Sequence, residues 1–211
     1  MTTLKTTLSI LLAAGTLSAC VGGGGGGDTD PGVTPGVPTD DGTRTFEERV
    51  AAGAALADRL EAQGLTDVAD MPTSGTATYV GAAGIVTDAS RKGIDTTNIT
   101  EANVEVIGDL EMTADFASSS VSGQIDNFEG ADGARFPGAA IISGGVISGN
   151  TLEADLGGSV NVYGTDETFT GTMRGDFTGA AADGVVGNMD GVLYGDEAGP
   201  SDFVGVFGGE R

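Results

Sequence analysis

The feature that most constrains the fold is a strict alternation of residue types in the last third of the chain, Gly164 to Arg211. From 169 to 179 every second residue is Phe, Met or Gly, and mostly Thr, Arg and Asp stand between them. Because residues two apart face the same side of a strand, this predicts a β-strand with one apolar and one wet face. The pattern restarts at Val185 and at Phe203 after clusters of turn-forming residues. Three such strands predict an antiparallel meander, and Gly on the inner face favours tight curvature into a barrel.

Five stretches upstream also have strand patterns, and the alternation is clearest from Val104 to Phe116. The pair Gly157-Gly158 predicts a bulge that interrupts the last of the five. The total of eight strands is the number at which a barrel interior is just filled by side chains or holds one small ligand. The five expected strands are 75–86, 104–116, 119–128, 139–147 and 151–162.

The N-terminus predicts export and a lipid anchor. Lys5 precedes a short apolar stretch that ends in Leu17-Ser18-Ala19-Cys20, which is typical of a secretory signal and too short for a spanning helix. This ending resembles the bacterial lipobox, and the resemblance implies cleavage after residue 19 and lipidation of Cys20. The alternative is an ordinary cleavage site beside a stray cysteine. Acyl chains contribute about 0.8 kcal/mol per buried CH₂, so Cys20 would hold the protein on a membrane. Val21 in place of Asp favours the outer membrane.

Residues 20–44 predict a disordered tether, because a run of Gly followed by Pro, Asp and Thr buries too little apolar surface to offset the entropy of ordering. The glycine run lacks the strand, helix and Lys of a phosphate-binding loop.

An amphipathic helix and its connector are expected over 45–70. Thr45 and Glu48 fit a capping box, and Gly64 fits the helix end. The helix either binds a partner or, as the narrow stripe favours, packs against the open end of the barrel. The apolar stripe is Phe46, Val50, Ala54, Ala57 and Leu60, and the residues expected to face water are Arg49, Asp58, Arg59 and Glu61.

Composition excludes several functions. Lys and Arg total 9 against 31 Asp and Glu, a formal net charge of -22, so nucleic acid is not an expected partner. The excess carboxylates form a solvated surface or steer a cationic partner, and their place on the polar face of strands favours the former. The chain contains no His, which excludes imidazole-ligated metals and His-based catalysis. No motif gathers a nucleophile with a base, so neither an enzyme nor a resident cofactor or metal is expected.

Three stretches carry a family resemblance. Met71 to Tyr79 at the start of the strands, and Gly175-Asp176-Phe177-Thr178-Gly179, Tyr194 to Ala198 and Phe203 to Arg211 near the end, are similar to small lipoproteins related to the β-barrel domain of transferrin-binding protein B. The resemblance covers 71–211 and is specific at the two ends. It implies an eight-stranded antiparallel barrel on an outer-membrane lipoprotein, in a family that acquires iron, haem or other solutes. This chain has one barrel, no handle domain and short loops, which puts transferrin itself in doubt.

The candidate ligand-binding residues are three cations in the longest connections, 87–98 and 127–137, together with Tyr79. Cations are scarce in this anionic chain, so Arg91, Lys92 and Arg135 are expected to bind an anionic group of a ligand at the barrel mouth. The alternative is that they only make the surface soluble, as isolated surface cations more often do.

Two cofactor alternatives are weaker. Oxygens of Asp126, Asn127, Glu129 and Asp132 could bind calcium, but the spacing fits no defined calcium loop. A haem could take only Tyr79, Tyr163, Tyr194 or a Met as axial ligand, and Tyr at a barrel end more often serves packing.

The sequence thus predicts an all-β chain: an eight-stranded antiparallel up-and-down barrel after one amphipathic helix and a disordered tether. Two functions remain open. One is a non-catalytic lipoprotein that binds a solute or protein ligand; the other is a structural envelope lipoprotein with a solid barrel and no small-molecule ligand.

Overall fold

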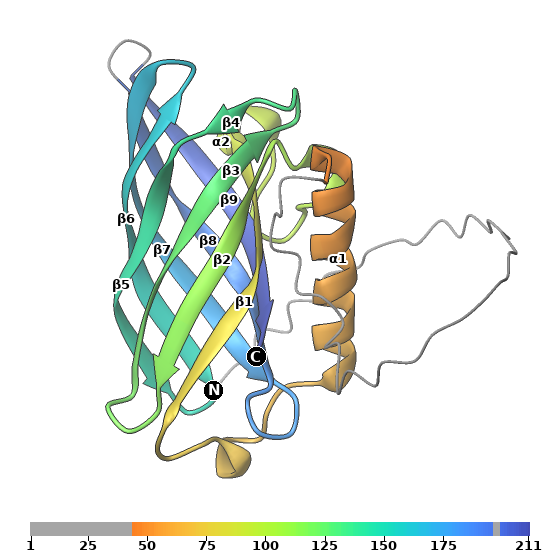
Figure 1. Ribbon diagram of the computed structural model, residues 1–211, viewed down its shortest axis with the longest axis vertical. Coiled ribbons are helices and arrows are strands. Elements are labelled where there is room, and N and C mark those ends of the chain that lie inside the picture. The colour runs from red at the N-terminus through yellow and green to blue at the C-terminus, as the bar shows by residue number, and fades with distance from the viewer. Residues whose placement is uncertain (1–43, 196–198) are drawn as a thin grey trace, which may run out of the picture.

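A computed structural model describes residues 44–195 and 199–211 (Figure 1). The predicted signal, the lipidation site Cys20 and the predicted tether up to residue 43 lie outside these residues. The strands are β1 (Thr76–Thr87), β2 (Val106–Asp115), β3 (Ser120–Gly130), β4 (Arg135–Phe136), β5 (Gly138–Ser148), β6 (Thr151–Val162), β7 (Thr165–Thr178), β8 (Gly184–Gly195) and β9 (Gly199–Glu210). The helices are α1 (Phe46–Gln63) and α2 (Ala89–Lys92), with short 3₁₀ turns at Val68–Asp70 and Glu101–Asn103.

Eight long strands form a closed antiparallel barrel, which confirms the predicted fold class. Each long strand pairs with its neighbours in sequence, and β1 pairs with β9 to close the cylinder, as at Ile85 and Gly205. The two-residue β4 adds only to the end of β3. Closure leaves the sheet without a free edge, so each long strand is hydrogen-bonded to a neighbour on both sides.

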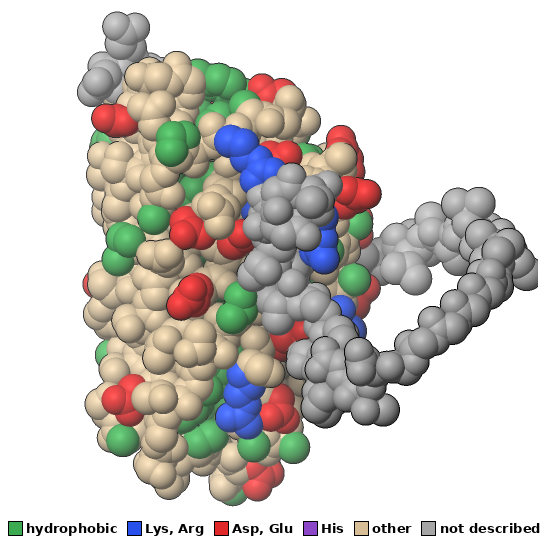
Figure 2. Space-filling view, viewed as in Figure 1, with side chains coloured by type: hydrophobic (Ala, Val, Ile, Leu, Met, Phe, Trp, Pro, Cys, Tyr) green, Lys and Arg blue, Asp and Glu red, His purple; other side chains and the backbone are tan. Residues whose placement is uncertain are grey.

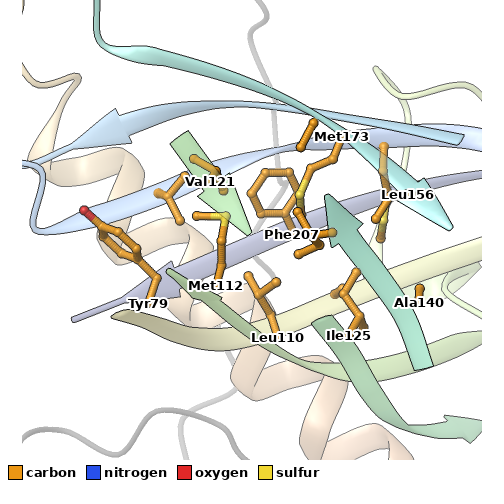
Figure 3. Packing of buried hydrophobic residues seen from close by; sticks show 14 of the residues in the cluster. Tyr79, Leu110, Met112, Val121, Ile125, Ala140, Leu156, Met173 and Phe207 are labelled. Atoms are coloured by element: carbon orange, nitrogen blue, oxygen red, sulfur yellow. The ribbon is translucent and has the colours of Figure 1, made fainter. Parts of the chain in front are cut away.

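The barrel interior is a packed apolar core (Figure 3). Met112, from the clear alternation of 104–116, and Phe177, from the apolar parity of 169–179, are fully buried there, as those patterns predict. Glycines on the inner face make room for large rings: a Cβ at Gly187 would lie 2.6 Å from Phe207, and one at Gly191 would lie 2.7 Å from Phe203. The apolar face of the alternating pattern therefore fills the barrel along most of its length.

The predicted bulge is on a different strand. Gly157 and Gly158 pair in regular register with both β5 and β7, so the prediction of a bulge there was wrong. The register shifts instead on β5, between Ser143 and Val146. Gly144, within that segment, has a φ of +62°, a backbone conformation that Gly adopts without steric cost.

Helix α1 lies along the outer wall of the barrel (Figure 1), so the predicted position against the open end was wrong. The physical reason is that β1 is apolar on both faces: Ala83 and Ile85 fill the interior, while Ala82 and Val86 pack outward with the helix. The helix approaches closely at Gly184, where a Cβ would lie 2.2 Å from Leu60 Cδ2. The outer wall is therefore part of the protein's core.

The helix ends are as predicted. Thr45 N donates to Glu48 Oε2 at 2.8 Å and Glu48 N donates to Thr45 Oγ1 at 3.3 Å, which completes the capping box. Gly64, at φ 75°, caps the other end. Within the described ranges, no helix has the length and apolar character needed to cross a membrane.

Candidate ligand site at the barrel mouth

The two ends of the barrel differ in their connections. At one end, called the mouth here, β1, β3, β6 and β8 finish and their partners begin, with the long connections 88–105 and 131–137 between them. At the other, called the closed end, the strands are joined by the shorter segments 116–119, 149–150 and 179–183. The structure thus brings the two longest connections together at one end, as predicted, and that end also holds the one-turn helix α2 (Figure 1).

A hollow of about 880 Å³ opens at the mouth. Its floor is apolar and includes Phe128, Phe136, Phe169 and Leu193. The Phe128 and Phe169 rings stack with centroids 5.9 Å apart, and Phe169 meets Phe203 edge-on at 5.4 Å. An apolar concave site with polar groups at its edge is the usual form of a small-molecule pocket. The ionisable side chains around the hollow are Asp88, Arg91, Glu105, Asp132, Tyr163, Glu167 and Asp202.

The three predicted cations sit at this end, and each forms an ion pair. Arg91 pairs with Asp88, Lys92 pairs with Glu105, and Arg135 Nη2 lies 3.4 Å from Glu129 Oε2. Only Arg91 of the three lines the hollow. The cations therefore neutralise neighbouring carboxylates, and the expectation that they meet an anionic ligand loses its main support.

Tyr79 does not belong to this group. It is fully buried near the start of β1, towards the closed end, where its hydroxyl donates to the Ala182 carbonyl oxygen at 2.6 Å. Burial is the main cause that raises the pKa of Tyr79 to about 12. The sequence-based grouping of Tyr79 with the mouth cations is therefore corrected: its side chain closes the core.

Glu167 is the mouth residue that the sequence interpretation missed. It lies two positions before Phe169 on β7 and shares its inward parity, opposite the buried Val160 of β6. Among the described residues it makes no hydrogen bond or ion pair. Burial, and secondarily the Asp88 carboxylate, raise its pKa above the usual value. The parity of the strand could have revealed it, since the alternation extends back from Phe169.

The carboxylates proposed for calcium are engaged elsewhere. Asp132 accepts a hydrogen bond from the Tyr163 hydroxyl, which is the largest cause that lowers the pKa of Asp132. Glu129 is bound by Arg49, and Asp126 accepts from Gln124 Nε2 at 2.8 Å. Within residues 44–195 and 199–211, no cluster of three or more His, Cys, Asp or Glu is placed to hold a metal ion.

Arg49 is a second residue whose position was predicted wrongly. It was expected to face water, but it is only 1% exposed. Its Nη1 donates to Glu129 Oε2 at 3.0 Å, and its Nη2 donates to Asp109 Oδ1 at 2.9 Å and to the Asn127 carbonyl oxygen at 3.0 Å. Because Glu129 also pairs with Arg135, this cluster connects the first turns of α1 to the mouth connection after β3.

The fold and the site place the protein among closed, antiparallel up-and-down barrels that have a packed core and a hollow at one end. Within that class, the chain belongs to the transferrin-binding protein B barrel family. The family model of the C-lobe and N-lobe beta barrels of Tf-binding protein B matches residues 71–211.

Several solved structures are similar to part of this chain. A double mutant of the vaccine antigen Transferrin Binding Protein B from Haemophilus parasuis Hp5 is similar at 20% identity and a TM-score of 0.44, covering 69% of this chain and 27% of that one. Intact Ap-TbpB with both lobes has 17% identity and a TM-score of 0.44 over 69% and 28% of the two chains. A surface lipoprotein has 13% identity and a TM-score of 0.38 over 69% and 64%. The chain spans less than a third of the two transferrin-binding proteins. No curated protein matches it.

Proposed function

We propose that this protein is a non-catalytic, lipid-anchored binding protein of the outer membrane, and that its ligand sits at the barrel mouth. The observation that carries the proposal is the hollow of about 880 Å³ with an apolar floor, framed by the two longest connections. Connections over a rigid barrel are where binding chemistry is usually placed.

The packed interior limits where a ligand can bind. Met112, Met173 and Phe177 are fully buried side chains of one continuous core. Because that core fills the cylinder, the ligand occupies the mouth and does not pass through the barrel. The same filled core favours a second candidate function, a structural envelope lipoprotein with no small-molecule ligand.

The family suggests acquisition of iron, haem or another solute as the biological setting. Transferrin itself is not our proposal, because the chain spans less than a third of the transferrin-binding proteins it resembles. A ligand matched to the hollow is small.

Native mass spectrometry of the protein purified from its own cells tests the function. We expect a retained small molecule, and we expect Ser201→Trp to lose it, because Ser201 lines the hollow and the indole would fill the space. Thr168→Trp is the control, since Thr168 is exposed on β7 beside the inward Glu167. A parent protein without any retained molecule would favour the structural alternative, and equal retention by both variants would place the site elsewhere.

The anchor needs a separate test. Cys20→Ser removes the thiol proposed to carry the lipid, so the protein should leave the membrane fraction or remain unprocessed. Unchanged fractionation with outer membranes would refute the anchoring proposal without affecting the mouth site.

A further inference from the structure

The carboxylates around the hollow fall into two groups. Asp88, Glu105, Asp132 and Asp202 each accept hydrogen bonds: Ser201 Oγ donates to Asp88 at 3.0 Å, Thr87 Oγ1 donates to Glu105 at 2.8 Å, the Ala134 amide donates to Asp132 at 3.0 Å, and Ser90 Oγ donates to Asp202 at 2.6 Å. Glu167 alone among these five lacks such a donor within the described part of the chain.

The pKa directions agree with this division. Hydrogen bonds from neighbouring groups are among the causes that lower the pKa values of Asp88, Glu105, Asp132 and Asp202. The pKa of Glu167 is raised instead, by burial and by the Asp88 charge. A bound cation would supply the interaction that the Glu167 carboxylate lacks.

The surroundings of Glu167 suit an apolar molecule as well as a positive charge. Phe169 lies two residues farther into the barrel on the same inner face, and the floor continues into Phe128 and Leu193. Aromatic faces attract cations and also bury apolar carbon. An isolated acidic cluster would attract only ions, whereas this arrangement adds an apolar floor directly beneath one inward-facing carboxylate.

The mouth cations do not favour an anion. Arg91, which lines the hollow, pairs with Asp88. Lys92 and Arg135 do not line it; Lys92 pairs with Glu105 of the lining, and Arg135 pairs with Glu129 outside it. A positive ligand therefore meets a mouth in which the local positive charges already have negative partners.

We propose that the mouth binds a small organic cation, an ammonium group on an apolar body, with Glu167 as its counter-charge and the phenylalanine floor beneath its carbon skeleton. This inference rests on the proposed function, since it names the ligand class of the same hollow. The ammonium donates to the Glu167 carboxylate, while the apolar part enters toward Phe169.

Three probes that share the same indole ring system but differ in charge test the proposal. Tryptamine carries an ammonium, tryptophol a neutral hydroxyl and indole-3-acetate a carboxylate on the same indole. Because the protein contains no Trp, indole fluorescence anisotropy reports on the probe alone. With the full chain in detergent at neutral pH, we expect tryptamine to bind at least about tenfold more tightly than tryptophol, equivalent to about 1.4 kcal/mol, and indole-3-acetate to bind weakest.

Two substitutions that each remove one negative charge test whether the preference for tryptamine depends on Glu167 itself. Glu167→Gln keeps the shape but removes the charge, and should abolish the preference of tryptamine over tryptophol. Asp166→Asn is the matched control: Asp166 is the exposed neighbour of Glu167 on the same strand and accepts a hydrogen bond from Asn161 at 2.7 Å. It should leave the preference unchanged, which separates a local contact from the general attraction of an anionic protein.

The failures of the two proposals are distinguishable. Equal binding of tryptamine and tryptophol, both lost in Ser201→Phe, which fills the hollow without adding an indole, would overturn the cation inference and leave the mouth site standing. A retained molecule in native mass spectrometry together with no binding of any probe would do the same. A tryptamine preference that survives in Glu167→Gln, or that disappears equally in Asp166→Asn, would also overturn it.

Discussion

The two ends of the barrel use the same inward parity for opposite purposes. At the closed end, Tyr79 and Phe116 pack their rings around Phe177, with centroids 5.8 and 5.9 Å from it. At the mouth, the inward positions include Glu167 and Ser201, and a hollow takes the place of packed rings. One strand, β7, carries both Phe177 and Glu167, so a single alternating pattern produces packed rings at one end and the lining of a hollow at the other.

Polar contacts seal the closed end further. The connector after α1 crosses it, where Leu65 forms a β-bridge with Thr178 and Thr66 Oγ1 donates to the Gly179 carbonyl at 2.8 Å. Asn150 Nδ2 donates to the Thr66 carbonyl at 2.7 Å. Acidic side chains are scattered over the whole face seen in Figure 2 and do not gather at this end. The closed end thus combines packed rings with polar contacts from the connector.

Truncation at the closed end should have the largest effect. Phe177→Ala removes a fully buried ring and should lower the free energy of unfolding by about 3–5 kcal/mol in urea denaturation. Phe136→Ala at the mouth should cost less, because the hollow already lies beside that ring. Thr170→Ala, exposed on the outer face of β7, should change stability by no more than about 0.5 kcal/mol. If Phe177→Ala and Phe136→Ala lowered the free energy of unfolding equally, the two ends would not differ in packing as described.

Removal of the buried guanidinium should come next. Arg49→Ala leaves Asp109 and Glu129 buried beside fewer positive charges and should cost about 3 kcal/mol, the lower end for a broken buried pair because Arg135 remains near Glu129. Hydrogen exchange should increase in α1 and in 131–137 and not at the closed end. The control is Arg59→Ala, whose pair with Glu210 is partly exposed and should be worth less than about 1 kcal/mol.

The closed-end tyrosine should have a smaller, pH-dependent effect. Tyr79→Phe removes the donor to the Ala182 carbonyl and should cost about 1–2 kcal/mol. Because burial raises the pKa of Tyr79 to about 12 in the folded protein, its stabilising contribution is present below the unfolded pKa of about 10 and is lost as the pH rises through 12. The difference in unfolding free energy between parent and variant should therefore shrink in strong alkali. A difference that is constant to pH 12 would contradict this.

At the mouth, the smallest effect on stability accompanies a change in binding. Glu167→Gln should alter the free energy of unfolding by no more than about 0.5 kcal/mol, with the parent gaining slightly as the pH falls, because the folded pKa is raised. Tryptamine affinity should fall over that same acidic range as Glu167 becomes neutral. The other ionisable groups that face the hollow are Asp88, Arg91, Glu105, Asp132, Tyr163 and Asp202. Asp166→Asn should keep the parent's pH profile of binding.

Sequence alternation predicted the parts of this protein that depend on local periodicity. It placed Met112 and Phe177 inside and identified all eight strands, because a barrel wall exposes alternate residues to two different environments. It also indicated the end at which the long connections meet. The prediction of a bulge at Gly157-Gly158 was wrong, because two adjacent glycines permit a register shift without requiring one.

Arg49 and Glu167 show what periodicity does not reveal. The partners of Arg49 lie 60 and 80 residues away, and nothing near it in sequence distinguishes a buried guanidinium from a solvated one. The helix position follows from the second apolar face of β1, which reads locally as an ordinary buried strand. Glu167 was visible as a charge on an inward parity, but its lack of a hydrogen-bond donor among the described residues depends on contacts between strands far apart in sequence.

The seam between β1 and β9 has a consequence for how the protein matures. β9 pairs with β1 on one side and with β8 on the other, so the cylinder closes only when the last strand arrives. A chain that emerges N-terminus first holds an open sheet whose edges are β1 and β8, and unpaired edges template aggregation. Such distant pairing is also slow, because the closure entropy is lost before the contacts form. Until β9 pairs with both neighbours these two edges stay unpaired, so deletion of β9 would leave them exposed permanently.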